Sequence, residues 1–129
     1  SPTLGAVRAV IGHALLMQGD IEAAKKSFEA EKNTLFGLPG IAIIAQRQGN
    51  KAAAQAALDQ LVAEHGDNGL YQQAQVYAQW GDADKAIAAL LAARAAGDAG
   101  LIQLYNDPML EPVRKRPEFS RLLKDIGFV

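Results

Sequence analysis

Apolar residues recur along this chain at the three- and four-residue spacing of amphipathic helices. The first such stretch contains Val7, Val10, Ile11, Ala14 and Leu15. A short sequence motif then occurs three times, at residues 18–24, 48–54 and 80–86, and in each a glycine is followed by Asp or Asn. Glycine can end a helix in the left-handed conformation, and the next side-chain oxygen can cap the helix that follows. The pattern therefore predicts three helix-turn-helix units.

The spacing of these motifs in the sequence predicts where the units begin and end. Gly19, Gly49 and Gly81 lie 30 and then 32 residues apart, and a period of that size is typical of a stacked helical array. We expect repeats at about residues 3–33, 38–65 and 68–96. Residues 36–40 read Phe-Gly-Leu-Pro-Gly and indicate a break between the first two repeats, with Pro39 placed to open a helix.

Residues 98–129 depart from the repeat pattern. Leu101 and Tyr105 belong to an expected short helix, and Pro117 is placed to open a last one that contains Phe119. A terminal repeat exposes an apolar face that must be covered, so we expect this segment to act as a cap. Residues 1–129 then form a single all-α domain, and the start without methionine indicates that it is excised from a larger protein.

Composition and charge exclude several kinds of partner. Half of the 129 residues are hydrophobic but only 6% are aromatic, which predicts a thin core of small side chains. The formal net charge of -1 provides no basic face for nucleic acid. No apolar run reaches the roughly 20 residues that span a bilayer. We therefore expect neither nucleic-acid binding nor membrane insertion by this segment.

The order of small and bulky residues resembles a tetratricopeptide repeat array. That family pairs a small residue on the first helix of a repeat with an alanine and an aromatic residue or leucine on the second. The matching triplets here are Gly12 with Ala24 and Phe28, Ala42 with Ala54 and Leu58, and Ala74 with Ala86 and Leu90. The resemblance implies a right-handed α-solenoid of three repeats with a C-terminal helical capping segment. The family's usual period is about 34 residues, so the turns or helices are shortened here.

The last sixty residues resemble one bacterial subfamily of these arrays. The resemblance rests on residues 71–78, 80–82, 100–104, 107–114, 117–119 and 122–123 and on Gly127. In that subfamily the array is the C-terminal part of signalling or regulatory proteins, and the N-terminal part is often a class III adenylate or guanylate cyclase or a winged-helix DNA-binding domain. The resemblance implies a cytoplasmic protein, or a periplasmic array if the parent protein has a transmembrane segment.

A tetratricopeptide stack would line its concave face with the first helix of each repeat. Helical phase then places eight side chains on that face or at its rim: His13, Met17, Ile43, Gln46, Arg47, Tyr71, Gln75 and Gln79. We expect them to bind a peptide or helix of a partner protein, with Tyr71 as the aromatic anchor. Two alternatives stay open, namely a homodimerisation module for an attached cyclase or DNA-binding domain and a small-ligand sensor.

The chain offers little that would support catalysis. Its two histidines, His13 and His65, lie in different repeats, and a metal site needs several converging ligands. No phosphate-binding loop or dinucleotide fingerprint is present. The basic run at residues 114–116 is expected to be solvated, and Trp80 to pack in the core. We therefore expect no enzymatic activity, no cofactor and no metal.

Overall fold

The computed structural model describes residues 2–128, and the side chains from residue 6 onward. Within that range the regular structure is entirely helical. The chain divides into two compact units, of which the first ends at His65 and the second begins at Gly66. Each unit is described by itself.

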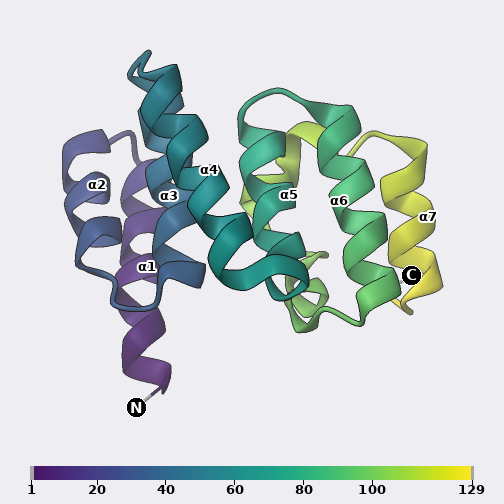
Figure 1. Ribbon diagram of the computed structural model, residues 1–129. Helices are drawn as coiled ribbons and strands as arrows, with labels where there is room; N and C mark the ends of the chain where they lie inside the picture. Colours follow the sequence, from purple (N-terminus) through teal and green to yellow (C-terminus); the bar gives the residue numbers. More distant parts are fainter. Residues whose placement is uncertain (1, 129) are drawn as a thin grey trace. The chain divides into compact units, whose positions relative to one another are not determined.

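The first unit consists of two helical hairpins. Helix α1 (Pro2–Met17) packs on α2 (Ile21–Ala30), and α3 (Thr34–Arg47) packs on α4 (Lys51–His65). Helix α2 also lies against α3, which joins the two hairpins into one unit (Figure 1).

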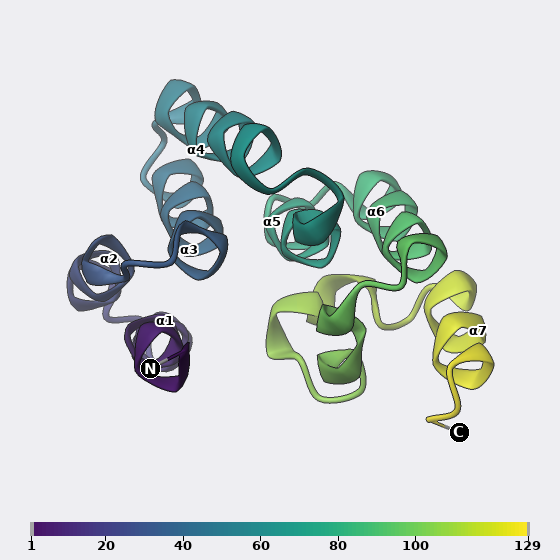
Figure 2. The ribbon, with the colours of Figure 1, turned by 60° about the horizontal axis from the view of Figure 1, so that its bottom comes forward.

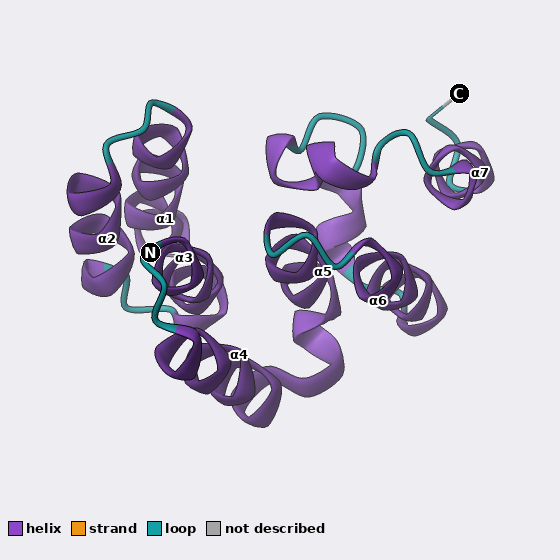
Figure 3. Cartoon of the chain, turned by 90° about the horizontal axis from the view of Figure 1, so that it is seen from above, coloured by secondary structure: helices purple, strands orange, loops and turns teal. Residues whose placement is uncertain are grey.

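The second unit contains one hairpin and the C-terminal tail. After the 3-10 helix η1 (Gly66–Gly69), α5 (Leu70–Gln79) packs on α6 (Ala83–Ala96). The tail forms the 3-10 helices η2 (Ala99–Gln103) and η3 (Pro108–Val113) and then α7 (Pro117–Asp125). Figure 2 shows the short helices of the tail beside α5, and α7 beside α6. Short loops join the helices in both units, and no strand occurs in the part of the chain that is drawn in colour (Figure 3).

The three glycine turns are built as the sequence predicts. Gly19, Gly49 and Gly81 have φ angles of 85°, 81° and 84°, in the left-handed region that favours glycine. The residue after each glycine caps the next helix through its side chain. For example, Asp82 Oδ1 accepts a hydrogen bond from the backbone N–H of Lys85 at 3.2 Å. The predicted ends of these helices are confirmed.

The expected break around Pro39 is wrong, because α3 begins at Thr34 and continues through this proline. The helix starts early because the side chain of Asn33 accepts a hydrogen bond from the Leu35 N–H at 3.0 Å. The glycines at residues 37 and 40 made this segment look like a break between helices. They are required because α2 packs very close to this part of α3. A Cβ at Gly37 would lie 2.9 Å from the carbonyl oxygen of Phe28, so only glycine fits there.

The core of the first unit is organised around Phe28, whose side chain is fully buried. Its ring lies between two glycines, Gly12 of α1 and Gly40 of α3. A Cβ at Gly12 would lie 2.9 Å from the ring, and a Cβ at Gly40 would overlap the ring's Cγ. The absence of these two Cβ atoms lets three helices meet on one aromatic side chain. The ring of His13 lies edge-on to that of Phe28, with centroids 5.0 Å apart.

The core of the second unit includes the tail. Fully buried Leu104, Leu110 and Val113 belong to the same cluster as Tyr71 of α5 and Leu90 of α6. Because α5 and α6 share their core with η2, η3 and α7, the tail is an integral part of this unit. None of the helices in the described range is both long and apolar enough to cross a bilayer.

In two of the hairpins, a carboxylate just after the second helix binds a backbone amide of the first helix. Glu31, just after α2, accepts hydrogen bonds from the N–H groups of Ala9 at 3.0 Å and Asn33 at 3.2 Å. Asp98, just after α6, accepts them from Tyr71 at 3.0 Å and Gly100 at 2.8 Å. Each carboxylate thus binds one amide of the partner helix and one amide two residues farther along the chain.

Candidate protein-binding surface

The eight residues expected on the concave face are divided between the two units. Helices α1 and α3 of the first unit carry five of them: His13, Met17, Ile43, Gln46 and Arg47. Helix α5 of the second unit carries Tyr71, Gln75 and Gln79.

In the second unit all three residues are bound by the protein's own tail. The Tyr71 hydroxyl donates a hydrogen bond to Asp107 Oδ2 at 2.6 Å. Gln75 Nε2 donates to the same oxygen at 2.7 Å, and Gln79 Nε2 donates to the carbonyl oxygen of Met109 at 2.8 Å. The face of α5 that was expected to meet a peptide therefore holds the segment around η3.

The expectation of an exposed aromatic anchor at Tyr71 is corrected by this arrangement. Tyr71 is fully buried, and Gly100 packs so closely that a Cβ there would lie 2.7 Å from Tyr71 Cβ. Burial, followed by the nearby Asp107 carboxylate, raises the pKa of Tyr71 well above its usual value. The phenol is thus a neutral hydrogen-bond donor inside the unit, and it would reach a partner only if the tail were displaced.

The polar cluster around Asp107 includes the tail's own backbone. Asp107 is 7% exposed, and its Oδ1 accepts a hydrogen bond from the Met109 N–H at 2.9 Å. Arg114 Nη2 donates to the Asp107 carbonyl oxygen at 3.1 Å. Buried polar groups are stable when their hydrogen bonds are satisfied, and here these bonds fix the start of η3 on α5.

In the first unit the five residues differ in exposure. Ile43 is fully buried and belongs to the core. Met17 is 58% exposed, Arg47 is exposed, and His13 and Gln46 are partly exposed. Met17 and Arg47 are the last residues of α1 and α3. The reachable part of the predicted site is therefore a set of four residues on two helices, and they make up what we call the α1/α3 surface.

The periodic apolar residues of α1 lie mainly on its exposed side. Val7, Val10 and Ile11 are 41%, 65% and 46% exposed, whereas Ala9 and Leu16 are buried. The core side of this helix combines the small residues Ala9 and Gly12 with Leu16, so the periodicity of the large apolar residues alone points to the wrong face. Sequence reasoning missed this surface, although the small residues of α1 were a signal for it.

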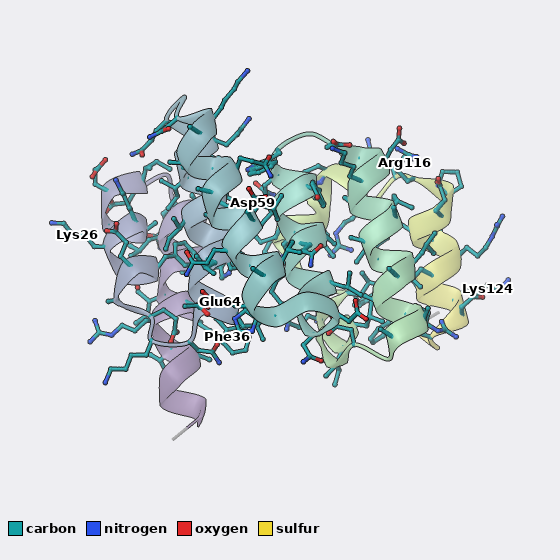
Figure 4. The ribbon with its side chains drawn as sticks, viewed as in Figure 1. Lys26, Phe36, Asp59, Glu64, Arg116 and Lys124 are labelled. Carbon is teal, nitrogen blue, oxygen red and sulfur yellow. The ribbon has the colours of Figure 1, made fainter. Side chains whose placement is uncertain are left out.

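A shallow depression of about 630 Å³ lies between α1 and α2 beside these side chains. It is lined by Val7, Arg8 and Ile11 of α1 and by Lys26 and Ser27 of α2. Figure 4 shows the labelled Lys26 side chain extending away from α2. This combination of aliphatic and basic side chains is a second candidate contact surface.

The basic run at residues 114–116 is not simply solvated. Arg116 Nη2 lies 2.9 Å from Asp84 Oδ1 and 3.1 Å from Glu118 Oε2, which joins the beginnings of α6 and α7. The hydrogen bond from Arg116 lowers the pKa of the Glu118 carboxyl. Arg114 lies 5.5 Å from the ring centre of Phe119. Arg114 and Arg116 therefore stabilise the fold of the second unit.

Trp80 and the Glu64–His65 pair also have local partners. Trp80 is partly exposed, and its ring lies edge-on to Tyr77 with centroids 6.2 Å apart. The hydroxyl of Thr34 donates a hydrogen bond to Glu64 Oε1 at 2.7 Å and lies 2.8 Å from His65 Nε2. Across residues 2–128, no group of three potential ligands is arranged to hold a metal ion.

Comparison with known proteins identifies one repeat. Neither the curated proteins nor the solved structures gave a match. Residues 68–93, which contain α5 and most of α6, match the family model described as a tetratricopeptide repeat. Together with the all-helical hairpin fold, this match supports assigning residues 68–93 to the tetratricopeptide repeat family.

Proposed function

We propose that this chain is a non-enzymatic protein-interaction module that binds a peptide or helix of a partner on the α1/α3 surface. Tetratricopeptide repeats generally mediate contacts between proteins. The observation that carries the proposal is the contrast between the two units. Helices α1 and α3, the first helices of the two hairpins in the first unit, keep Met17 and Arg47 exposed. The matching face of α5 in the second unit is covered by η3.

The exposed residues suit a partner that has both apolar and acidic groups. Met17 has a flexible and polarisable side chain that adapts to different apolar contacts. The guanidinium of Arg47 can bind a carboxylate in a bidentate manner, and Gln46 can donate to or accept from a backbone. A short extended peptide or one turn of helix with these groups would fit the chemistry of the surface.

The test is to select peptides from a displayed random library and measure their affinity by calorimetry. Variants Met17→Asp and Arg47→Glu should each lower the affinity about tenfold, because they remove an apolar contact or reverse a charge. The control variant Leu91→Asp changes a residue that is 49% exposed on α6 of the second unit. Equal affinity for all four proteins, or no selected peptide, would contradict the proposal.

A second candidate function is homodimerisation through α1. The observation that favours it is the exposure of Val7, Val10 and Ile11 along one helix, since contiguous exposed apolar side chains mark interaction surfaces. Light scattering across a wide concentration range tests it. A dimer that Val10→Asp dissociates would support this candidate, and a monomer at every concentration would contradict it.

The parent protein is proposed to be a bacterial signalling or regulatory protein in the cytoplasm. The support is the resemblance of residues 107–114, 117–119 and 122–123 and of Gly127 to the tail of that subfamily. In such a protein the array would act beside a cyclase or winged-helix domain. A small-ligand sensor is the weaker alternative, because the face of α5 that would receive the ligand already holds η3.

A further inference from the structure

We infer that the depression between α1 and α2 is a docking site for an acidic amphipathic helix of a partner protein. This surface is different from the α1/α3 surface, and the inference does not depend on the function proposed for the latter. It is an alternative to homodimerisation through α1, since both would bury Val7 and Ile11. The depression has aliphatic side chains, Val7 and Ile11, and basic side chains, Arg8 and Lys26.

The apolar part of the site is accessible. Val7 is 41% exposed and Ile11 is 46% exposed, and Val10 on the same helix is 65% exposed. Aliphatic side chains at this spacing form a stripe on one side of a helix. A partner helix with leucines at helical spacing could bury that stripe and place a side chain in the depression, as in other helix-in-groove complexes.

The site is built on a fixed base. Ser27 Oγ of α2 donates a 2.6 Å hydrogen bond to the carbonyl oxygen of Arg8. This bond joins the two helices through residues that line the depression. The apolar and basic groups are therefore presented by helices that are already packed together, which lowers the entropy cost of binding.

The charge of the site selects the chemistry of the partner. Among residues 2–128, neither Arg8 nor Lys26 forms an ion pair with a carboxylate. Arg8 is the only charged residue of α1. The acids nearest to Lys26 in sequence are Glu22 and Glu29 on α2, and Glu22 Oε1 already accepts a hydrogen bond from Gln48 at 3.2 Å. The carboxylate of Glu31 lies beside the N–H of Ala9, next to Arg8, but its two oxygens accept hydrogen bonds from backbone amides. Two basic groups beside an apolar stripe thus complement a helix that carries both Leu and Glu or Asp.

This charge pattern favours an acidic protein over two other occupants. A second copy of the chain would bring an α1 that has no carboxylate to meet Arg8. An anionic membrane is attracted by clusters of about four to eight basic residues, and the lining of this depression has two. A protein helix needs only a few well-placed carboxylates.

The test uses the 129-residue chain and a fluorescent 18-residue peptide built from Leu and Glu at helical spacing. The matched peptide has Lys in place of every Glu. Fluorescence anisotropy should show saturable binding of the acidic peptide that weakens as salt is added, and no binding of the basic one. In a nuclear magnetic resonance titration, the amides of Val7, Ile11 and Ser27 should shift most.

The variant Arg8→Glu/Lys26→Glu should weaken binding of the acidic peptide about tenfold or more, because two attractions become repulsions. The control Lys115→Glu/Lys124→Glu makes the same change in net charge at two exposed residues of the tail and should bind like the unchanged protein. The variant Arg47→Glu should also bind normally, which separates this inference from the proposed function.

Three outcomes would overturn the inference. The first is equal affinity of the two double variants for the acidic peptide, and the second is the absence of saturable binding. The third is binding to vesicles of phosphatidylserine and phosphatidylcholine that is lost in Arg8→Glu/Lys26→Glu while the acidic peptide does not bind, since a lipid surface would then be the occupant.

Discussion

The hydroxyl of Tyr71 donates a 2.6 Å hydrogen bond to the carboxylate of Asp107, which lies 36 residues later in the chain. The bond joins the first helix of the third hairpin to the tail at a fully buried position. Gln75 donates to the same carboxylate oxygen at 2.7 Å. This cluster explains why the face of α5 is closed to a partner, and it makes the stability of the second unit depend on a few polar atoms.

Substituting Tyr71 with phenylalanine should destabilise the second unit less than substituting Asp107 with alanine. Tyr71→Phe removes one hydrogen bond but leaves Asp107 with Gln75, so we expect a loss of about 1–2 kcal/mol in the free energy of unfolding. Asp107→Ala leaves a buried hydroxyl and a buried amide without their acceptor, so we expect a loss of about 3 kcal/mol. Urea denaturation followed by circular dichroism measures both.

The double variant tests whether the two residues act together. If the hydrogen bond is the cause, Tyr71→Phe should cost much less when Asp107 is already alanine. Purely additive losses would show that the hydroxyl of Tyr71 contributes to stability independently of its hydrogen bond to Asp107.

The same pair predicts how stability changes at alkaline pH. The pKa of Tyr71 is raised in the folded protein by burial and by Asp107, whereas an exposed tyrosine in the unfolded chain ionises near pH 10. Above about pH 10 the unfolded chain loses a proton that the folded protein keeps, so the free energy of unfolding falls as the pH rises. Below that pH this contribution is fully present.

Comparison with Tyr71→Phe isolates this effect from other alkaline titrations. The variant has no hydroxyl to ionise at residue 71, while Tyr77 and Tyr105 are present in both proteins. The difference in stability between the two proteins should therefore narrow between pH 9 and pH 11 (about one unit on each side of the usual tyrosine value). A constant difference across that range would contradict a raised pKa.

The parts of the fold that could be predicted from the sequence are those fixed by neighbouring residues. The turns at Gly19, Gly49 and Gly81 needed only a glycine and a following capping side chain, and all three formed as predicted. The all-helical class also follows from residue preferences that are summed over many positions.

The parts that could not be predicted depend on residues far apart in the sequence. Nothing near Tyr71 indicates that Asp107 will cover it, so helical phase placed this side chain on an open face. The packing of Gly12 against Phe28 was predicted from the repeat pattern, whereas the burial of Ala9 was missed because a small residue carries little hydrophobic signal. The break at Pro39 was predicted from the local preference of proline. The packing of this part of α3 is determined instead by the close approach of Phe28.

The contact between Phe28 and Gly40 predicts that a substitution favoured by helix propensity will be harmful. In the interior of a helix, Gly→Ala normally stabilises by about 0.5–1 kcal/mol. At Gly40 the new methyl group would overlap the buried ring of Phe28, and overpacking of a core costs about 1–3 kcal/mol. We therefore expect Gly40→Ala to lower the thermal midpoint of the first unit, measured by calorimetry.

A second background gives the control for this contact. In a protein with Phe28→Leu the ring is replaced by a smaller side chain, so Gly40→Ala should cost less there than in the unchanged protein. Stabilisation by Gly40→Ala in the unchanged protein would show that the helices can separate without cost, and that the close approach is not needed.

The carboxylate of Glu31 offers a last prediction, because it is 7% exposed and accepts hydrogen bonds from the amides of both Ala9 and Asn33. Glu31→Ala leaves both amides without this acceptor, and we expect a loss of about 2–3 kcal/mol in the free energy of unfolding. Glu31→Gln keeps one acceptor oxygen and should lose about 1 kcal/mol. Glu29→Ala is the matched control on the exposed side of α2 and should change stability by less than about 0.5 kcal/mol. Equal losses in Glu31→Gln and Glu31→Ala would mean that the one acceptor oxygen that glutamine keeps does not hold α1 to the end of α2.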